Sequence, residues 1–481
     1  MNFKIIIRAL GALLLIESFF ILLSLGVSLI YGESDWQSLL YSTLITLSVG
    51  AILLAFSHKA VRDVGKREAY IIVSFVWIVF SLFGALPFYL GGEIPSFTDA
   101  FFETISGFTT TGSSILNNIE AMPHGLLFWR SLTQWLGGMG IIVMSIAILP
   151  FFGIGGMQLF SAEVPGPTAD KIHPRVKETA KRLWAIYLMF TIIETILLLF
   201  GGMNLFDAIN HSFTTMATGG YSTKQASIAY WNSPYIQYVI TIFMFIAGTN
   251  FSLSYFAINL KFKKIWQDEE FKYYLGFTLI FSIAITLMLI FSENLGIERS
   301  FRDAIFQVVS LMTTTGFATA DYMSWIIPIS TLLFVVMFFG GSAGSTGGGI
   351  KIVRIVIMFK NSVLEFKRLI HPNAIIPVRM NHKAVHGKIV RNVLAFIVFY
   401  IIIFFVSTLI MSFFGLDVET AMGAVIATLG NIGPGIGSVG PAENFYTIPD
   451  GGKWFLGFLM LIGRLELFTV LIILSPAFWK K

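Results

Sequence analysis

Apolar runs of about 20 residues recur along the whole chain, and no other feature constrains its fold as strongly. A helix rises about 1.5 Å per residue, so a run of that length matches the hydrocarbon core of a membrane. Only helices and closed barrels satisfy their own backbone groups inside lipid, and these runs are continuous rather than alternating. With 12% charged residues among 481, the chain is predicted to be an all-α polytopic membrane protein.

The first apolar run lies between Arg8 and Glu33 and carries a single charge, Glu17. It is longer than the core of a signal peptide and lacks a small-residue cleavage motif, so we interpret it as a retained transmembrane helix. The sequence has no cysteine, which excludes disulfides, thiolate metal sites and thiol catalysis.

Basic residues gather in alternate loops and at both ends of the chain, whereas the intervening loops are poor in lysine and arginine. By the positive-inside rule, both termini and the basic loops are predicted to face the cytoplasm. We interpret the pI of about 9.1 as a result of this topology rather than as a nucleic-acid-binding surface. The basic clusters are Lys4 with Arg8, Lys59–Arg67, Lys171–Arg182, Lys261–Lys264, Lys351–Arg391, and Lys480 with Lys481.

Four segments in the intervening loops align without gaps, and each ends on a glycine. Each opens with a residue type that caps helices, and an aspartate or threonine follows three positions later, as in a capping box. Recurrence at roughly 100 residues indicates an internally duplicated architecture. The four segments are Ser96–Gly112, Asn204–Gly220, Ser300–Gly316 and Asp417–Gly433.

Each repeat is predicted to contain a crossing helix, a short helix that dips halfway into the membrane, and a returning crossing helix. A short helix of about twelve residues spans about 18 Å, or half a membrane. The predicted crossings are 69–90, 182–202, 272–293 and 389–414 in one direction and 126–150, 235–259, 324–371 and 453–477 in the other. The predicted units are an N-terminal helix pair at 1–60 and repeats at 61–160, 161–265, 266–372 and 373–481.

The glycine-containing strand after each short helix is predicted to line the pathway of an ion. Non-helical backbone at membrane depth is tolerated only where it is buried in protein or lines water, so four equivalent strands are predicted to surround one central pore. Glycine lets consecutive carbonyls point to one side, and rings of carbonyl oxygens replace the hydration shell of a monovalent cation. The C-terminal ends of the short helices also favour a cation. The loops hold no ring of acidic side chains, so the pattern favours K⁺ over a divalent ion.

Several motifs together resemble the Trk/Ktr/HKT superfamily of potassium transporters, and within it the TrkH branch of bacterial Trk potassium-uptake systems. The motifs, spread over essentially the whole chain, are "FWRSLTQWLGGMGIIV", "TTTGSS", "ATGGYS", "TTTGFAT", "GNIGPGIG" and "GGSAGSTGGGIK". The resemblance implies K⁺ uptake across the bacterial inner membrane through a selectivity filter with one glycine per repeat. The filter residues carried over are Thr110, Thr111, Gly112, Thr218, Gly219, Gly220, Thr314, Thr315, Gly316, Asn431, Ile432 and Gly433.

Two details of these loops bear on selectivity. Relatives with serine in place of the first filter glycine favour Na⁺, so Gly112 implies a K⁺ conductor. The fourth loop departs from the Thr-x-Gly pattern, because Asn431 stands where the other loops have threonine. We therefore expect an asymmetric pore.

A second glycine-rich stretch, 340–349, interrupts an apolar span that is too long for one crossing helix. A phosphate-binding loop would need Gly-Lys-Ser/Thr, whereas Ile350 separates Gly349 from Lys351. The resemblance implies a gate beneath the filter, and a glycine run has little side-chain packing to lock one arrangement. The residues carried over as the gate are Gly344, Ser345, Thr346, Gly347, Gly348, Gly349 and Arg464.

Arg464 lies inside an apolar run, where a charge is costly and needs a partner. Glu466 is two positions away and does not share its helix face. The resemblance implies that Arg464 holds carbonyl oxygens of the glycine-rich loop and adds a positive barrier.

Four other polar residues have types or spacings that suggest a role. Glu103 is predicted either to attract cations at the outer mouth or to serve as a structural acceptor. Arg130 is interpreted as an interfacial anchor. His382 and His386 have the i, i+4 spacing of a helical metal pair, but without a third ligand nearby they are interpreted as solvated.

The resemblance also implies partners. These are a second copy of the chain and a cytosolic ring of TrkA-like subunits that bind NAD or ATP. The chain itself is expected to contact membrane lipid and to conduct K⁺, and to bind neither a covalent cofactor nor nucleic acid. The alternative function is a Na⁺- or H⁺-coupled secondary transporter that binds another small substrate at broken helices, which predicts inverted repeats. An intramembrane enzyme is disfavoured, because the sequence shows no paired nucleophile and base and no metal triad.

Overall fold

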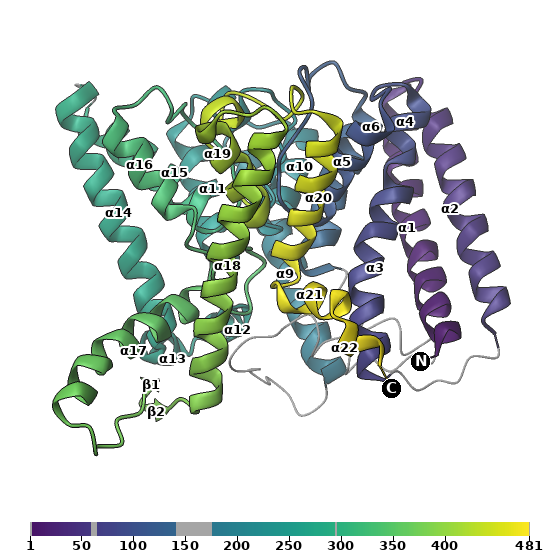
Figure 1. Ribbon diagram of the computed structural model, residues 1–481. Helices are drawn as coiled ribbons and strands as arrows, with labels where there is room; N and C mark the ends of the chain where they lie inside the picture. The colour runs from purple at the N-terminus through teal and green to yellow at the C-terminus, as the bar shows by residue number, and fades with distance from the viewer. Residues whose placement is uncertain (1, 59–64, 141–175, 294–295, 481) are drawn as a thin grey trace.

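The computed structural model describes residues 2–58, 65–140, 176–293 and 296–480. Helices run roughly side by side through the whole molecule, which confirms the all-α class (Figure 1). Both chain termini lie at one end of the bundle, which we call the terminal face, and the four short helices lie toward the opposite end. Several outer helices expose large apolar side chains along their length, as expected for contact with lipid.

The N-terminal pair consists of α1 (Phe3–Tyr31) and α2 (Trp36–Phe56), which pack closely along their length. Small residues permit this contact, since a methyl group on Gly11 would lie 2.9 Å from the Leu53 side chain. Helix α1 also packs against the first repeat, where Glu17 is buried beside Gly84.

The outward crossing of each repeat is a long helix, as predicted. These helices are α3 (Lys66–Gly84) continued by α4 (Leu86–Gly91), then α9 (Val176–Phe200), α14 (Glu269–Glu293) and α18 (Gly387–Phe413). Together with α1 and α2 they give six helices in the described residues that are long and apolar enough to cross a membrane. The chain is therefore a multi-pass membrane protein.

The four short helices are α5 (Phe97–Phe108), α10 (Leu205–Met216), α15 (Ile297–Met312) and α19 (Val418–Leu429). In three of them the predicted cap is correct, because the side chains of Ser96, Asn204 and Asp417 accept the backbone N–H three residues on. The hydrogen bonds from Thr420 lower the pKa of Asp417. The prediction for Ser300 was wrong: α15 begins four residues earlier, about one turn, with Gly296 at its N-cap and Glu298 in its first turn.

Two returning crossings, 235–259 and 453–477, differ from prediction, because they are broken rather than continuous. The break in the third, 324–371, was predicted. Helices α11 (Pro234–Ala247) and α12 (Phe251–Ile258) meet at 111°, and α20 (Asp450–Arg464) and α21 (Phe468–Leu474) meet at 118°. In the third repeat the glycine-rich stretch separates α16 (Ile327–Val336) from α17 (Ile352–Ile370). In the first repeat α6 (His124–Trp135) runs into the π-helix η1 (Leu136–Gly140), and the rest of the predicted crossing 126–150 lies outside the described residues.

Each bend has a local cause. After Ala247 the chain leaves the helix at Gly248, and the Asn250 side chain accepts the Ser252 N–H and so caps α12. At the other bend Glu466 and Leu467 have φ of 55° and 57°, a left-handed conformation that ends α20.

Short elements complete the fold. A two-stranded hairpin, β1 (Arg379–Met380) with β2 (Lys383–Ala384), lies at the terminal face and was not predicted (Figure 1). The remaining helices are α13 (Phe262–Gln267) and α22 (Pro476–Trp479), with the 3₁₀ turns η3 (Ser227–Tyr230) and η4 (Gly437–Val439).

Candidate ion pathway

All four short helices end in the same way. The N–H of the residue before each predicted filter glycine donates to the carbonyl five residues earlier, at 2.8–2.9 Å, which closes the last turn as in a Schellman motif. The residue two positions before each glycine is left-handed in all four, with φ of 53°, 52°, 59° and 52°. These residues are Thr110, Thr218, Thr314 and Asn431. Left-handed conformations are costly for β-branched threonine, so three of these four positions are strained, as is common at functional sites.

The four predicted filter glycines are left-handed too, with φ of 85°, 75°, 83° and 103°. They form a closed ring. A methyl group on Gly112 would overlap the carbonyl oxygen of Gly219, one on Gly220 that of Thr315, and one on Gly316 that of Ile432. A methyl group on Gly433 would lie 2.9 Å from the carbonyl oxygen of Thr111, which returns to the first repeat. Each glycine therefore contacts the carbonyl that precedes the glycine of the next repeat.

Side chains tie the strands of this ring to their helices. The hydroxyls of Thr109 and Thr111 lie 2.8 Å apart, and the equivalent pair Thr313 and Thr315 lies 2.7 Å apart. Asn431 donates at 2.9 Å both to the Thr111 hydroxyl and to the carbonyl of Met460. The fourth strand is thus joined to the first, which is the asymmetry expected from the Asn431 substitution.

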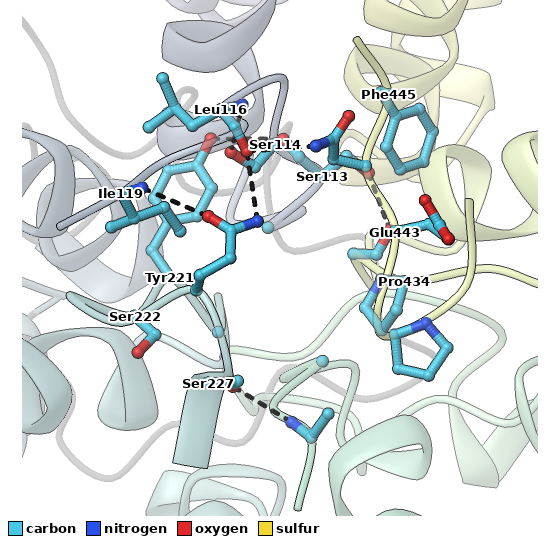
Figure 2. Close-up of a pocket in the computed structure, with 18 of the residues that line it drawn as sticks. Ser113, Ser114, Leu116, Ile119, Tyr221, Ser222, Ser227, Pro434, Glu443 and Phe445 are labelled. Carbon is cyan, nitrogen blue, oxygen red and sulfur yellow. Dashed lines mark hydrogen bonds between the residues drawn. The ribbon is translucent and has the colours of Figure 1, made fainter. Parts of the chain in front are cut away.

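A cavity of about 80 Å³ lies on the side of the ring away from the terminal face, and all four filter glycines line it. Figure 2 shows Tyr221 and Ser222 on one wall and Pro434, Glu443 and Phe445 on the other. Hydrogen bonds between loops of different repeats close its rim, for example from Phe445 N to the carbonyl of Ser114 at 2.8 Å.

The helix ends around the ring favour a cation. Each short helix ends directly before its strand, so the negative ends of four helix dipoles point toward the ring. Glu443 is the single carboxylate among the residues that line the cavity, and Arg130 and Lys224 are the basic residues among them. The described part of the chain holds no group of three histidines or acidic residues that could bind a metal ion.

The glycine-rich stretch forms a loop on the other side of the ring. Its base is closed, because Phe339 and Ile350 are bridged and Gly340 N donates to the Ile350 carbonyl at 2.8 Å. The Thr346 hydroxyl donates to the carbonyls at the ends of α10 and α11, at 3.2 and 3.3 Å. The N–H of Gly348 donates to the Thr314 hydroxyl at 2.6 Å. The loop therefore lies directly beneath the left-handed residues of the ring.

Arg464, the last residue of α20, joins this loop to the first repeat. Its guanidinium donates to the Thr346 carbonyl at 2.8 Å, the Thr110 hydroxyl at 2.9 Å, and the carbonyls of Gly137 and Gly138 at 2.5 and 2.7 Å. The predicted contact between Arg464 and the loop is present, whereas its role as a barrier stays a prediction. Thr110 is thus bonded to Arg464, and Thr314 is bonded to the glycine-rich loop.

Two charged residues hold the ends of the loop, and sequence reasoning missed both as site residues. One oxygen of Glu270, at the start of α14, accepts the N–H of Ala343 at 2.7 Å and that of Val353 at 3.3 Å. Lys351 donates to the carbonyl of Gly347. Glu270 lies among acidic residues at a predicted loop boundary, so its sequence context gives no signal of this contact.

The structure corrects the interpretation of Arg130. It is not an interfacial anchor: it is 2% exposed, pairs with Glu103 at 2.7 Å, and stacks 3.5 Å from the Tyr221 ring. Glu103 is 1% exposed and also accepts from Ser114 and Ile115, so of its two predicted roles the structural acceptor is correct. One available signal was the i, i+4 pair of Arg130 and Gln134 in an apolar helix, which indicates buried polar contacts.

His382 and His386 do not lie on one helix face. His382 is in the turn of the hairpin, and His386 caps α18 by accepting the Lys388 N–H at 3.2 Å. Both are exposed, as predicted for a solvated pair.

Comparisons with known proteins agree on one relationship. The chain matches the TrkH family, described as cation transport protein, over residues 37–481. It is 42% identical to the Trk system potassium uptake protein TrkH of Salmonella typhimurium and 41% identical to that of Escherichia coli, covering all of each chain. It is 33% identical to TrkG of Escherichia coli, covering 99% of both. The crystal structure of the potassium transporter TrkH from Vibrio parahaemolyticus superposes with a TM-score of 0.90 over 100% of both chains, at 37% identity.

Proposed function

The chain belongs to the TrkH family of cation transport proteins, a family of transporters rather than enzymes, and from that premise we propose that it conducts K⁺ into the bacterial cell. The observation that carries the proposal is the closed ring of four left-handed glycines, each against a carbonyl of the next repeat. The K⁺ ion would be coordinated by backbone oxygens of Thr111, Gly219, Thr315 and Ile432 and their neighbours.

Carbonyl coordination accounts for the choice of ion. Sites for Ca²⁺ and Mg²⁺ use carboxylates, and the ring is built from backbone, threonine and asparagine. A secondary transporter for an anionic substrate would aim helix N-termini at its site, whereas the four short helices end at the ring with their C-termini. Both features support a conductor of monovalent cations over the alternative function.

The loop from Gly344 to Gly349 is proposed as the gate. It lies beneath the ring, contacts the ends of α10 and α11, and is held by Arg464, whose charge would oppose a cation in the same space. An ion leaving the ring toward the terminal face would meet this loop. Opening then requires that the loop exchange its bonds to Thr314 and Arg464 for another arrangement.

We place the terminal face in the cytoplasm of an inner-membrane protein. The hairpin and the ends of α13 and α17 lie at this face, and these segments carry many of the basic residues of the chain. The same surface would receive a TrkA-like ring whose subunits bind NAD or ATP, and the chain would dock on this ring as a homodimer.

The proposal is tested by Rb⁺ uptake into proteoliposomes that contain this chain alone, with K⁺ or Na⁺ added as competitor. We expect K⁺ to inhibit far better than Na⁺, and Gly316→Ser to reduce this preference. Protein that is folded and reconstituted but carries no Rb⁺, or does not distinguish the two competitors, would overturn K⁺ conduction and favour the secondary transporter.

A further inference from the structure

In each of the first three repeats, the side chain nine residues before the filter glycine contacts the strand that leaves the filter. In the first repeat Glu103 accepts from the Ser114 hydroxyl at 3.0 Å, and in the second His211 lies 2.9 Å from the Ser222 hydroxyl. Both serines stand two residues after their filter glycine. In the third repeat the equivalent Gln307 donates to the Ala320 carbonyl at 3.1 Å, and the fourth has Ala424. In the first two repeats, the short helix thus holds the strand in the same way, through a side chain that hydrogen-bonds to the serine two residues after the filter glycine.

Arg130 joins the Glu103–Ser114 pair of the first repeat to the His211–Ser222 pair of the second. Its Nε donates to Glu103, and its Nη1 donates to the carbonyl of Ser222 at 2.9 Å. Its guanidinium covers Tyr221, the residue that directly follows the second filter glycine. The Tyr221 hydroxyl donates to the carbonyl of Glu103 at 2.6 Å, so the contact between the two repeats is closed on both sides.

Gln134 lies one turn further along α6 and hydrogen-bonds to the second strand on either side of Gly220. Its Nε2 donates to the carbonyl of Gly219 at 2.7 Å, and its Oε1 accepts the N–H of Tyr221 at 3.0 Å. It is fully buried, so both groups would be unsatisfied if the strand moved. The Gly219 carbonyl is also the one that contacts Gly112 in the ring.

We propose that Glu103, Arg130 and Gln134 are positioning residues that fix the filter strands of the first two repeats and thereby set discrimination between K⁺ and Na⁺. This inference rests on the proposed function. A ring that tells two ions of the same charge apart must hold its oxygens at fixed separations or fixed field strength. The three side chains bond to the backbone of Gly219, Tyr221, Ser222 and Ile115 and to the Ser114 hydroxyl, all adjacent to the ring, so they act on the strands rather than on the ion.

The first test compares Gln134→Leu with Gln237→Leu in the Rb⁺ uptake assay. Gln237 is a matched control, because it is a buried glutamine on the equivalent helix α11 that donates to Trp231 outside the filter strands. Without Gln134 we expect the ratio of the Na⁺ to the K⁺ inhibition constant to fall about tenfold, as expected when one or two buried hydrogen bonds are lost. Gln237→Leu is expected to keep the wild-type ratio.

The second test uses Arg130→Lys. Lysine keeps the charge that Glu103 needs but cannot reproduce the planar fork that also reaches Ser222. We expect this variant to fold, to carry Rb⁺, and to discriminate less well. Gln134→Leu leaves no buried charge without a partner. Its selectivity ratio therefore tests the positioning role even if Arg130→Lys does not fold.

An unchanged selectivity ratio in Gln134→Leu, with Rb⁺ still carried, would overturn the positioning role and leave the proposed function intact. An equal fall in Gln134→Leu and Gln237→Leu would also overturn it, because the effect would then be general loosening. Absence of Rb⁺ flux in the wild type would instead overturn the proposed function on which the inference rests.

Discussion

At the scale of single residues, the ring is uneven in the space around its glycines. A methyl group would overlap a carbonyl oxygen at Gly112, Gly220 and Gly316, but at Gly433 the nearest oxygen is 2.9 Å away. All four are left-handed, so a side chain costs about 1 kcal/mol of backbone strain at each. The overlap is therefore what distinguishes the four positions.

We predict that Gly433→Ala retains most of the K⁺-sensitive Rb⁺ uptake, whereas Gly316→Ala retains a smaller uptake that is less selective for K⁺. The methyl group at 433 needs a shift of a few tenths of an ångström, but at 316 it must displace the Ile432 carbonyl. Uptake in proteoliposomes at matched protein density measures the difference. Equal loss in both variants would show that strain in the backbone, rather than contact with the next repeat, decides the effect.

The left-handed threonines allow a second comparison. Thr218 bonds through its hydroxyl to the carbonyl of Ala217, whereas the Thr314 hydroxyl accepts from the loop. Asparagine tolerates this conformation and occupies the equivalent position in the fourth repeat, as Asn431. We predict that Thr218→Asn stabilises the folded protein by about 1 kcal/mol through relief of strain.

The measurement is thermal unfolding in detergent, with Thr314→Asn as the matched comparison. That variant relieves the same strain but loses the hydrogen bond to Gly348, so its gain is expected to be smaller. A fall in the unfolding temperature of Thr218→Asn would contradict the assignment of strain to this position.

At the scale of elements, the loop is an excursion with a closed base. Phe339 and Ile350 are already bridged, so the residues between them can be shortened without separating α16 from α17. Deleting Gly344–Gly349 leaves four residues, 340–343, between the bridged pair, and an extended chain of four residues spans about 13 Å. The deletion also removes Thr346, which bonds to the ends of α10 and α11, and Gly348, which bonds to Thr314.

We therefore predict that the Gly344–Gly349 deletion folds and carries Rb⁺ faster than the wild type, with its preference for K⁺ unchanged. The initial rate of uptake reports the gate, and the ratio of inhibition constants reports the filter. A slower rate in folded protein would mean that the loop supports the pathway rather than obstructing it.

The elements also show which parts of the structure can be predicted from sequence. The short helices, their caps and the filter glycines follow local rules, and four copies made the pattern visible. The bends at Gly248 and Glu466 were missed, because the polar residues beside them interrupt the apolar runs only briefly, and so short an interruption does not show whether the helix stops. Arg130 was misassigned for a similar reason, since its partner Glu103 is 27 residues away and no local pattern joins them.

At the scale of the whole molecule, one central ring joins all four repeats. Each filter glycine contacts the next repeat, and the fourth contacts the first, so an ion in the ring would touch every repeat at once. A ligand that binds only the folded state stabilises it by an amount that grows with the logarithm of its concentration. Occupancy of the ring should therefore raise the stability of the entire assembly of repeats.

We predict that K⁺ and Rb⁺ raise the thermal unfolding temperature in detergent, while Na⁺ and Mg²⁺ at equal ionic strength do not. At about one hundred times the dissociation constant the gain is about 2.7 kcal/mol. Gly220→Ala serves as the control, because the methyl group would overlap the Thr315 carbonyl and distort the ring. Its unfolding temperature should no longer respond to K⁺. A response of equal size to K⁺ and Na⁺ would mean that the ions act on the protein surface, and a response that persists in Gly220→Ala would place the K⁺ site elsewhere.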